Sequence, residues 1–434
     1  MRLFMLQSLK KQEQKLGNWL QGAPTAWFVL YALVAGFSTY FCMYAFRKPF
    51  AAAAYEGVSG WDYLIDFKIL AITAQVLGYA LSKFIGIKIV SEISRGRRAL
   101  VIVGLIVASE LALILFATLP PELKIIAIFL NGLPLGMIWG LVFSFMEGRL
   151  VSEILGAGLC ASFIVSSGAV KSVGAALIKY MGVAEFWMPA ATGALFLPLL
   201  MLSVYFLSLL PPPQEKDEKH RSRREPMDAA ERALFFRSYA FGFICLALSY
   251  VVFTALRDFR DNFAAELWIA LGYGDVPSVF LLSELPIAVI VLIMLGVTAV
   301  IRNNTRALLL YHRVVIAGAA TVGLSTLLYS AGFIGPFAWM VLLGTGLYVA
   351  YVPFNCIIFD RLLAAVRDKG NAGFMIYVVD AFGYLGSFLL LLYKNFGAAE
   401  LSWLDFFQYA AYTAAVLGSG LVAMALLYFR RRLW

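Results

Sequence analysis

The sequence predicts an all-α membrane protein in which twelve transmembrane helices form two pseudo-symmetric six-helix halves. Of the 434 residues, 62% are hydrophobic and 14% are charged, whereas soluble globular proteins carry about 25% charged residues. The apolar residues gather into twelve runs of about 20 residues, the length that crosses the hydrocarbon core of a bilayer as a helix. The longest hydrophilic stretch, from Pro211 to Arg237, divides these runs into six and six.

The chain starts with an amphipathic segment, 1–23, in which leucines are interleaved with lysines, and we expect it to lie at the membrane interface as a helix. The first six-helix half then covers 24–210 and the second covers 237–434, with a charged cytoplasmic linker over 211–236. The expected spans, bounded by charges, glycines or prolines, are 26–46, 64–85, 99–118, 124–146, 156–179, 186–210, 237–256, 278–301, 307–330, 335–356, 371–393 and 402–428.

The ends of the first and seventh spans carry further expectations. We expect the helices that end at Phe46 and Leu256 to continue outward as long helices.

Glycines at helical contact spacing, Gly132 with Gly136 and Gly383 with Gly386, predict close helix packing. The four cysteines all fall inside apolar stretches and are expected to be buried thiols.

Lysine and arginine residues set the expected orientation, because cytoplasmic loops retain positive charge. Of the 35 basic residues, 25 lie in the N-terminal segment, in or near the loops after even-numbered spans, or at the C-terminus, and only four lie on the opposite side. We therefore expect an integral protein of the plasma (inner) membrane with both termini in the cytoplasm.

This topology predicts that an impermeant thiol reagent, added to intact cells, leaves an engineered cysteine at Ser222 in the linker unmodified. Permeabilised cells provide the positive control, because the same cysteine should then react. Modification from outside intact cells would overturn the topology.

Six basic residues lie in or beside the spans, where a guanidinium costs at least about 2.5 kcal/mol unless it has a partner or water. They are Arg47, Lys48, Lys83, Lys171, Arg257 and Arg260. Arg47 and Arg257 follow the first spans of the two halves and, facing one cavity, would hold a dianion through bidentate hydrogen bonds. Alternatively, Arg47 and Lys48 extend to the outer headgroups, while Arg257 pairs with Asp258 or Asp261. Lys83 could likewise extend to the cytoplasm, but Lys171 stands well inside its span.

Acidic residues inside spans are the candidates for proton coupling or charge tuning. Glu110, Glu284 and Asp380 would be counter-ions of the basic residues, proton carriers, or outward-facing groups at span ends. Asp258 belongs with them because it follows Arg257 directly. An unpaired Asp380 would be neutral at pH 7 and able to carry a coupling proton.

Other function classes find no support in the sequence. We find no Ser/His/Asp set, zinc-binding spacing or phosphate-cradling loop, so we do not expect an enzyme, a metal or a cofactor. The net charge is +9, but the basic residues lie in short loops between apolar runs, where they indicate topology rather than nucleic-acid binding. We expect a monomer in the lipid bilayer that binds a small anionic substrate.

Residues 40–50 (YFCMYAFRKPF) resemble the first helix of the organophosphate:phosphate antiporters of the major facilitator superfamily, which include the glycerol-3-phosphate and hexose-phosphate transporters. Residues 78–84 (GYALSKF) with 92–95 resemble the end of helix two and the loop after it, and 370–386 resembles helix eleven. The resemblance implies the fold of that superfamily and transport by rocking of two halves. It also implies that Arg47 and Arg257 bind the phosphoryl group, assisted by Lys48 and Lys83.

The sequence departs from that family at several places. Val165 stands at or next to the position of the family's substrate-site histidine, and acids follow Arg257 closely. These departures indicate a divergent member whose ligand is a phosphorylated anion, a different anion or a zwitterion.

We therefore expect a secondary active transporter of a small polar solute, an organic phosphorylated anion, that works by exchange or proton coupling. A membrane-embedded ligand sensor on the same fold is an alternative, and so is a lipid-handling membrane protein. The linker is short and rich in charge, with little apolar surface for a signalling partner, which favours the carrier.

Overall fold

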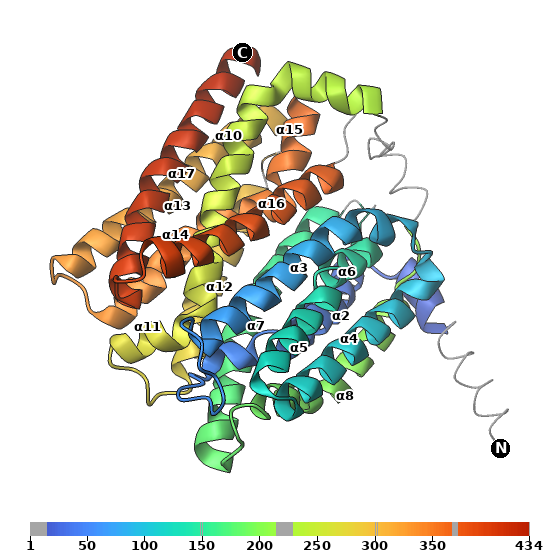
Figure 1. Cartoon of the computed structure of the whole chain (residues 1–434). Helices are drawn as coiled ribbons and strands as arrows, with labels where there is room; N and C mark the ends of the chain where they lie inside the picture. The colour runs from blue at the N-terminus through green and yellow to red at the C-terminus, as the bar shows by residue number, and fades with distance from the viewer. Residues whose placement is uncertain are drawn as a thin grey trace, which may run out of the picture.

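The computed structural model describes residues 15–147, 149, 151–213, 229–299, 301, 303–366 and 372–433. Within these ranges the chain forms helices joined by short loops (Figure 1). Residues 15–22, in the N-terminal segment, are helical. The rest of that segment and most of the linker, including Ser222, lie outside the described residues, so the topology stays a prediction.

Each half contains six membrane-length spans, some of them divided into two helices. The first half comprises α2 (Thr25–Met43), η1 (Tyr44–Phe46), η2 (Pro49–Ala52), α3 (Phe67–Glu92), α4 (Arg95–Thr118), α5 (Pro121–Leu135), α6 (Ile138–Met146), α7 (Ser152–Met181) and α8 (Met188–Ser208). The second comprises α10 (Ala229–Asn262), α11 (Ala264–Ala270), α12 (Val279–Ala299), α13 (Asn304–Ser330), α14 (Pro336–Cys356), α15 (Ile358–Val366), α16 (Ala372–Leu392), η3 (Tyr393–Gly397) and α17 (Trp403–Leu433).

Twelve helical segments of the described chain are long and apolar enough to cross a membrane, and they coincide with the twelve spans expected from the sequence. Local chemistry sets several ends. The Asp66 side chain caps α3 by accepting hydrogen bonds from the amides of Lys68 and Ile69. Gly182 ends α7 with a φ of +67°, a conformation that favours glycine.

The expectation of a long helix is confirmed at Leu256 but wrong at Phe46. Helix α10 continues past Leu256 to Asn262, and α11 follows. In the first half, α2 ends at Met43, and short 3₁₀ turns carry the chain to Ala52. Pro49 lacks the amide hydrogen that a continuing α-helix would need at this position.

The two halves repeat one packing pattern. In the first half, α5 packs on α3 and α4, α2 packs on α7 and α8, and α4 packs on α8. The corresponding helices of the second half make the same contacts: α14 packs on α12 and α13, α10 on α16 and α17, and α13 on α17. In each half the helix that starts the fourth span is also followed by a short helix of nine residues, α6 after α5 and α15 after α14. The pseudo-symmetry is therefore structural, although the two sequences differ.

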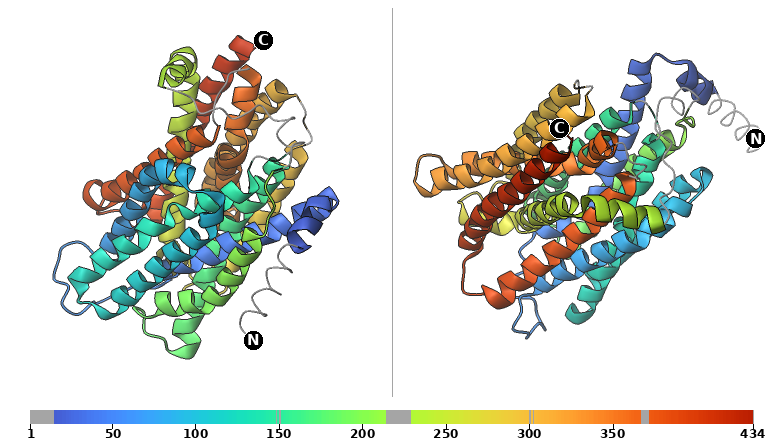
Figure 2. Two further views of the ribbon diagram at one scale, coloured as in Figure 1. Left: turned by 90° about the vertical axis from the view of Figure 1, so that its right-hand side faces the viewer. Right: turned by 90° about the horizontal axis from the view of Figure 1, so that it is seen from above.

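The halves meet along two helix pairs, α3 with α16 and α7 with α12, which are related by the same pseudo-symmetry. Figure 2 shows the two groups of helices, blue to green and yellow to red, from two further directions. The predicted packing glycines lie at close helix contacts: a side chain at Gly132 would collide with the backbone of Gln75, and one at Gly383 with Tyr250 and Thr254. The four cysteines are buried thiols that are not joined in disulfides, as expected.

Candidate functional site

A small cavity between the halves is lined by three of the polar side chains predicted to act, Lys83, Arg257 and Asp380. Its volume is about 20 Å³, room for one or two water molecules. The first half contributes Tyr40, Tyr44, Tyr79, Lys83, Trp139 and Phe163 to its wall, and the second contributes Arg257, Tyr351, Asn355, Asp380 and Tyr384. We call this the central cavity.

Arg47 lies beside the central cavity and is only 2% exposed. Its backbone is held in the turn after η1, where the Gln75 side chain donates a hydrogen bond to the Arg47 carbonyl oxygen over 3.0 Å. The guanidinium carbon lies 3.6 Å from the centre of the Tyr79 ring and 5.4 Å from that of Tyr384. Nε and Nη1 of Arg47 have no hydrogen-bond partner among the described residues. Arg47 is therefore oriented by aromatic stacking, and two of its donors are unused.

Arg257 lies on α10, across the cavity, and is 3% exposed. Its Nη2 donates to Asp258 Oδ1 over 3.1 Å and to the Tyr384 hydroxyl over 3.3 Å. Its guanidinium carbon is 5.9 Å from the centre of the Tyr384 ring. The structure thus brings Arg47 and Arg257 from opposite halves to the same tyrosine ring. The alternative expectation that Arg257 pairs with Asp258 also agrees with the geometry.

Lys83 and Asp380 form an ion pair across the halves, with 2.8 Å between Nζ and Oδ2. The Tyr250 hydroxyl donates to the other carboxylate oxygen over 2.7 Å. Of the alternatives for Asp380, this geometry agrees with a counter-ion of a basic residue, because α3 and α16 pack closely enough to place a lysine beside it. Lys83 is 2% exposed and lies within the interface rather than at the membrane surface.

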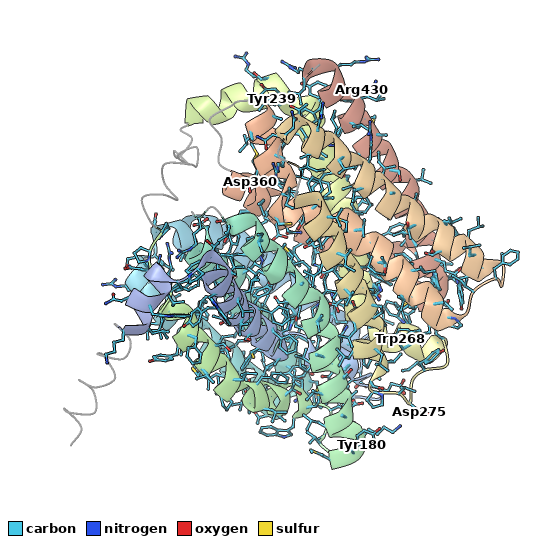
Figure 3. All side chains as sticks on the ribbon, turned by 180° about the vertical axis from the view of Figure 1, so that it is seen from behind. Tyr180, Tyr239, Trp268, Asp275, Asp360 and Arg430 are labelled. Atoms are coloured by element: carbon cyan, nitrogen blue, oxygen red, sulfur yellow. The ribbon has the colours of Figure 1, made fainter. Side chains whose placement is uncertain are left out.

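A second cluster closes one end of the interface. The Asp261 carboxylate forms ion pairs with two lysines: Oδ2 lies 2.6 Å from Lys48 Nζ, and Oδ1 lies 2.6 Å from Lys171 Nζ. The Ser167 hydroxyl donates a hydrogen bond to the same carboxylate. At this end η2 contacts α11, and Lys68 pairs with Glu266. We call this the sealed end; Figure 3 shows Tyr180, Trp268 and Asp275 near it, with Tyr239 and Arg430 at the opposite end.

The remaining predicted acids lie outside the central cavity. Glu284 pairs with Arg260 over 2.6 Å, and both line a separate cavity of about 10 Å³ next to Lys171. Glu110 lies inside the first half, where its carboxylate faces Gly193 beside Phe46. The structure therefore separates Glu110 and Glu284 from the two arginines.

The ion pairs between the halves share one polarity. In every such pair of the described residues, the first half supplies a lysine and the second supplies the acid. Around the two cavities, however, the charges do not balance. The six buried cations predicted from the sequence face four buried acids, which are Asp258, Asp261, Glu284 and Asp380. Six minus four leaves two positive charges without a counter-charge in the described part of the interface.

Sequence reasoning missed the tyrosines that surround the cations and the position of Asp261 between two lysines. Helical spacing was the available signal, because Tyr40 and Tyr44, and likewise Tyr351 and Asn355, stand four residues apart and share a helix face. The pairing of Lys83 with Asp380 had no such signal, since it depends on the packing of α3 against α16.

One family model matches the sequence of this chain, and solved structures of transporters share its fold. A model described as a family of unknown function (DUF5690) matches residues 49–432. No curated protein sequence matches the chain. A D-xylose–proton symporter aligns over 90% of this chain and 96% of its own, with a TM-score of 0.60 and 13% identity. The human organic anion transporter MFSD10 (TETRAN) aligns over 93% of this chain and 100% of its own, with a TM-score of 0.59 and 13% identity. The predicted major facilitator superfamily fold is thereby confirmed.

Proposed function

The chain belongs to DUF5690, a family of unknown function, and we propose that it is a secondary transporter that moves a small organic anion across a membrane by alternating access. The observation that carries the proposal is the pair of buried arginines, one from each half, beside a central cavity with unused guanidinium donors. An excess of buried positive charge is costly, and a bound anion removes that cost.

The geometry favours a ligand with several acceptor oxygens. Nε and Nη1 of Arg47 each form an edge of the guanidinium together with Nη2, and either edge has the shape that binds two oxygens of a phosphoryl or carboxylate group. Around it, the tyrosine hydroxyls of the central cavity add neutral donors, and their rings offer faces to the apolar part of a ligand. A phosphorylated organic anion fits this set of groups best, because it combines two negative charges with an organic body.

Alternating access is supported by the way the halves are joined. The sealed end is held by lysine–acid pairs, and the central cavity is too small for anything larger than water. A solute must therefore widen the interface in order to enter or leave. The two helix pairs at the interface are related by pseudo-symmetry, so the halves can rock about them while the arginines stay central.

A thermal-shift screen of the purified protein against phosphate esters, dicarboxylates and amino acids tests the ligand class. We expect a phosphate ester to raise the melting temperature most, because it should bind most tightly. A ligand at 100 times its dissociation constant stabilises the folded state by about 2.7 kcal/mol. A response to amino acids alone would reject the anion. Uptake of the stabilising compound into proteoliposomes then separates a carrier from a ligand sensor, which binds without moving solute.

Asp380 is the proposed coupling carboxylate, because it lines the central cavity and joins Lys83 to Tyr250. An incoming anion that attracts Lys83 weakens this pair and lets Asp380 take up a proton. Asp380→Asn is therefore expected to flatten the pH dependence of transport in proteoliposomes. Glu284→Gln is the control, because that acid pairs with Arg260 outside the central cavity. An unchanged pH profile in Asp380→Asn would leave this residue only a structural role.

A further inference from the structure

We propose that Asp258 is a built-in substitute for the transported anion: its carboxylate neutralises the arginine pair when the central cavity is empty, and the solute displaces it. This inference rests on the proposed function. It adds two roles for Asp258 that do not follow from the charge of the arginines: Asp258 sets the affinity for the anion, and it permits the empty protein to move.

The contacts of Asp258 carry the inference. It is 1% exposed, and Oδ1 lies 3.1 Å from Nη2 of Arg257. Oδ2 is buried and has no hydrogen-bond partner among the described residues. Two of the other buried acids are held differently: Asp261 receives two lysines, and Asp380 receives Lys83 and a tyrosine hydroxyl. Glu284 also has a single arginine partner and an unpartnered oxygen, but its contact with Arg260 is shorter, at 2.6 Å, and it lies outside the central cavity.

A carboxylate at the central cavity that is held by one arginine contact of 3.1 Å is displaced by an incoming anion more easily than one held by two lysines or by a lysine and a hydroxyl. Leaving a buried charged oxygen unpaired costs free energy, so the bond network does not hold Asp258 tightly in place. Asp258 is also close enough to act electrostatically on Arg47 and Lys48, from the first half. Its direct contact is with Arg257, and its charge reaches Arg47 only at longer range.

Displacement has two consequences. A ligand must compete with an internal carboxylate, which lowers its affinity. In the empty protein, Asp258 keeps the arginines partly neutralised, so that the halves can rock without a solute. Removing its charge should therefore tighten anion binding and slow the movement of the empty protein.

Inorganic phosphate is the probe for the first consequence, because it presents the phosphoryl oxygens alone. We expect purified Asp258→Asn to bind phosphate about tenfold more tightly than the wild type, since one nearby negative charge is gone. Glu284→Gln removes the same charge from the neighbouring cavity and should bind phosphate as the wild type does. If Asp258→Asn binds phosphate no more tightly than the wild type, the inference is overturned. Binding of phosphate by the wild-type protein itself would still support the proposed function.

Formate tests the inference even when phosphate does not bind, because it has the size of the group that Asp258→Ala removes. We expect formate, compared with chloride at equal ionic strength, to raise the melting temperature of Asp258→Ala by at least about 2 °C more than that of the wild type. Equal shifts would overturn the inference. A variant that cannot be purified in chloride is prepared in formate; recovery there supports the substitute anion, and failure there too contradicts it.

Discussion

Replacing Arg47 or Arg257 by lysine is expected to weaken binding of the preferred phosphate ester by about 10- to 100-fold, the loss of one charge-assisted hydrogen bond at constant formal charge. An ammonium supplies a point charge, but it has no planar fork for two oxygens and cannot stack as a guanidinium does. Arg47 lies 3.6 Å from the centre of the Tyr79 ring, so stacking fixes its orientation. Arg257 contacts Asp258 and Tyr384 through Nη2, and its buried Nε has no partner among the described residues, so a lysine would lose that second donor.

The matched control is Arg260→Lys. Arg260 is buried on α10, about one turn beyond Arg257, but it pairs with Glu284 and lines the separate cavity. Lysine can keep that ion pair, so we expect phosphate-ester affinity to remain at the wild-type level. The measurement is the dissociation constant on purified variants whose melting temperatures show that they are folded.

Near-wild-type affinity in both Arg47→Lys and Arg257→Lys would reject the two-arginine site and leave the substrate class open. Loss at Arg47 alone would mean that Arg257 serves mainly as the partner of Asp258. That outcome would also contradict displacement of Asp258 by the solute, so the two proposals constrain each other.

The fold could be predicted from the sequence because membrane insertion is a local property of the chain. Twelve apolar runs of bilayer length predict twelve spans, whatever packs against them. Departures from a continuous helix occur where backbone chemistry interrupts a run. Pro49 follows the first span and replaces a long helix with 3₁₀ turns, and the fourth span breaks between Leu135 and Ile138, near Pro134.

The site could be predicted only in part, because the sequence shows which charges are costly but not which of them meet. Arg47 and Arg257 stood out because each follows the first span of its half. Asp380 stood out for the same energetic reason, yet its partner Lys83 is almost 300 residues away, at 2.8 Å in the structure. Pairing across the interface is set by the tertiary packing of α3 on α16, which no local pattern specifies.

Asp261→Asn is expected to have the largest effect on stability. Asp261 is the carboxylate between Lys48 and Lys171, with 2.6 Å to each, and its side chain is 6% exposed. Removing one partner of a buried ion pair costs about 3–5 kcal/mol, because the remaining charge stays buried. Here two ammonium groups lose their counter-charge at once. We therefore expect a lower melting temperature and looser contact between the halves at the sealed end.

Loosening is measured by the reactivity of an engineered cysteine at Ala264, a buried residue of α11, in a background without the native cysteines. We expect thiol reagents to modify it faster in Asp261→Asn than in the parent. Asp275→Asn is the matched control at the same end, because Lys179 and Asp275 also join the halves but are exposed and 4.0 Å apart. An exposed pair contributes little, so stability and labelling should be unchanged.

Neutralising both lysines as well separates charge burial from sealing. The triple variant Lys48→Gln/Lys171→Gln/Asp261→Asn leaves no unpaired charge in the cluster, so it should recover much of the melting temperature lost in Asp261→Asn. Its labelling at Ala264→Cys should nevertheless remain faster than in the parent, because the bonds that join η2 and α7 to α10 are gone. Labelling at the parent rate in both variants would mean that apolar packing alone holds this end closed, and that the lysine–Asp261 cluster is not a gate.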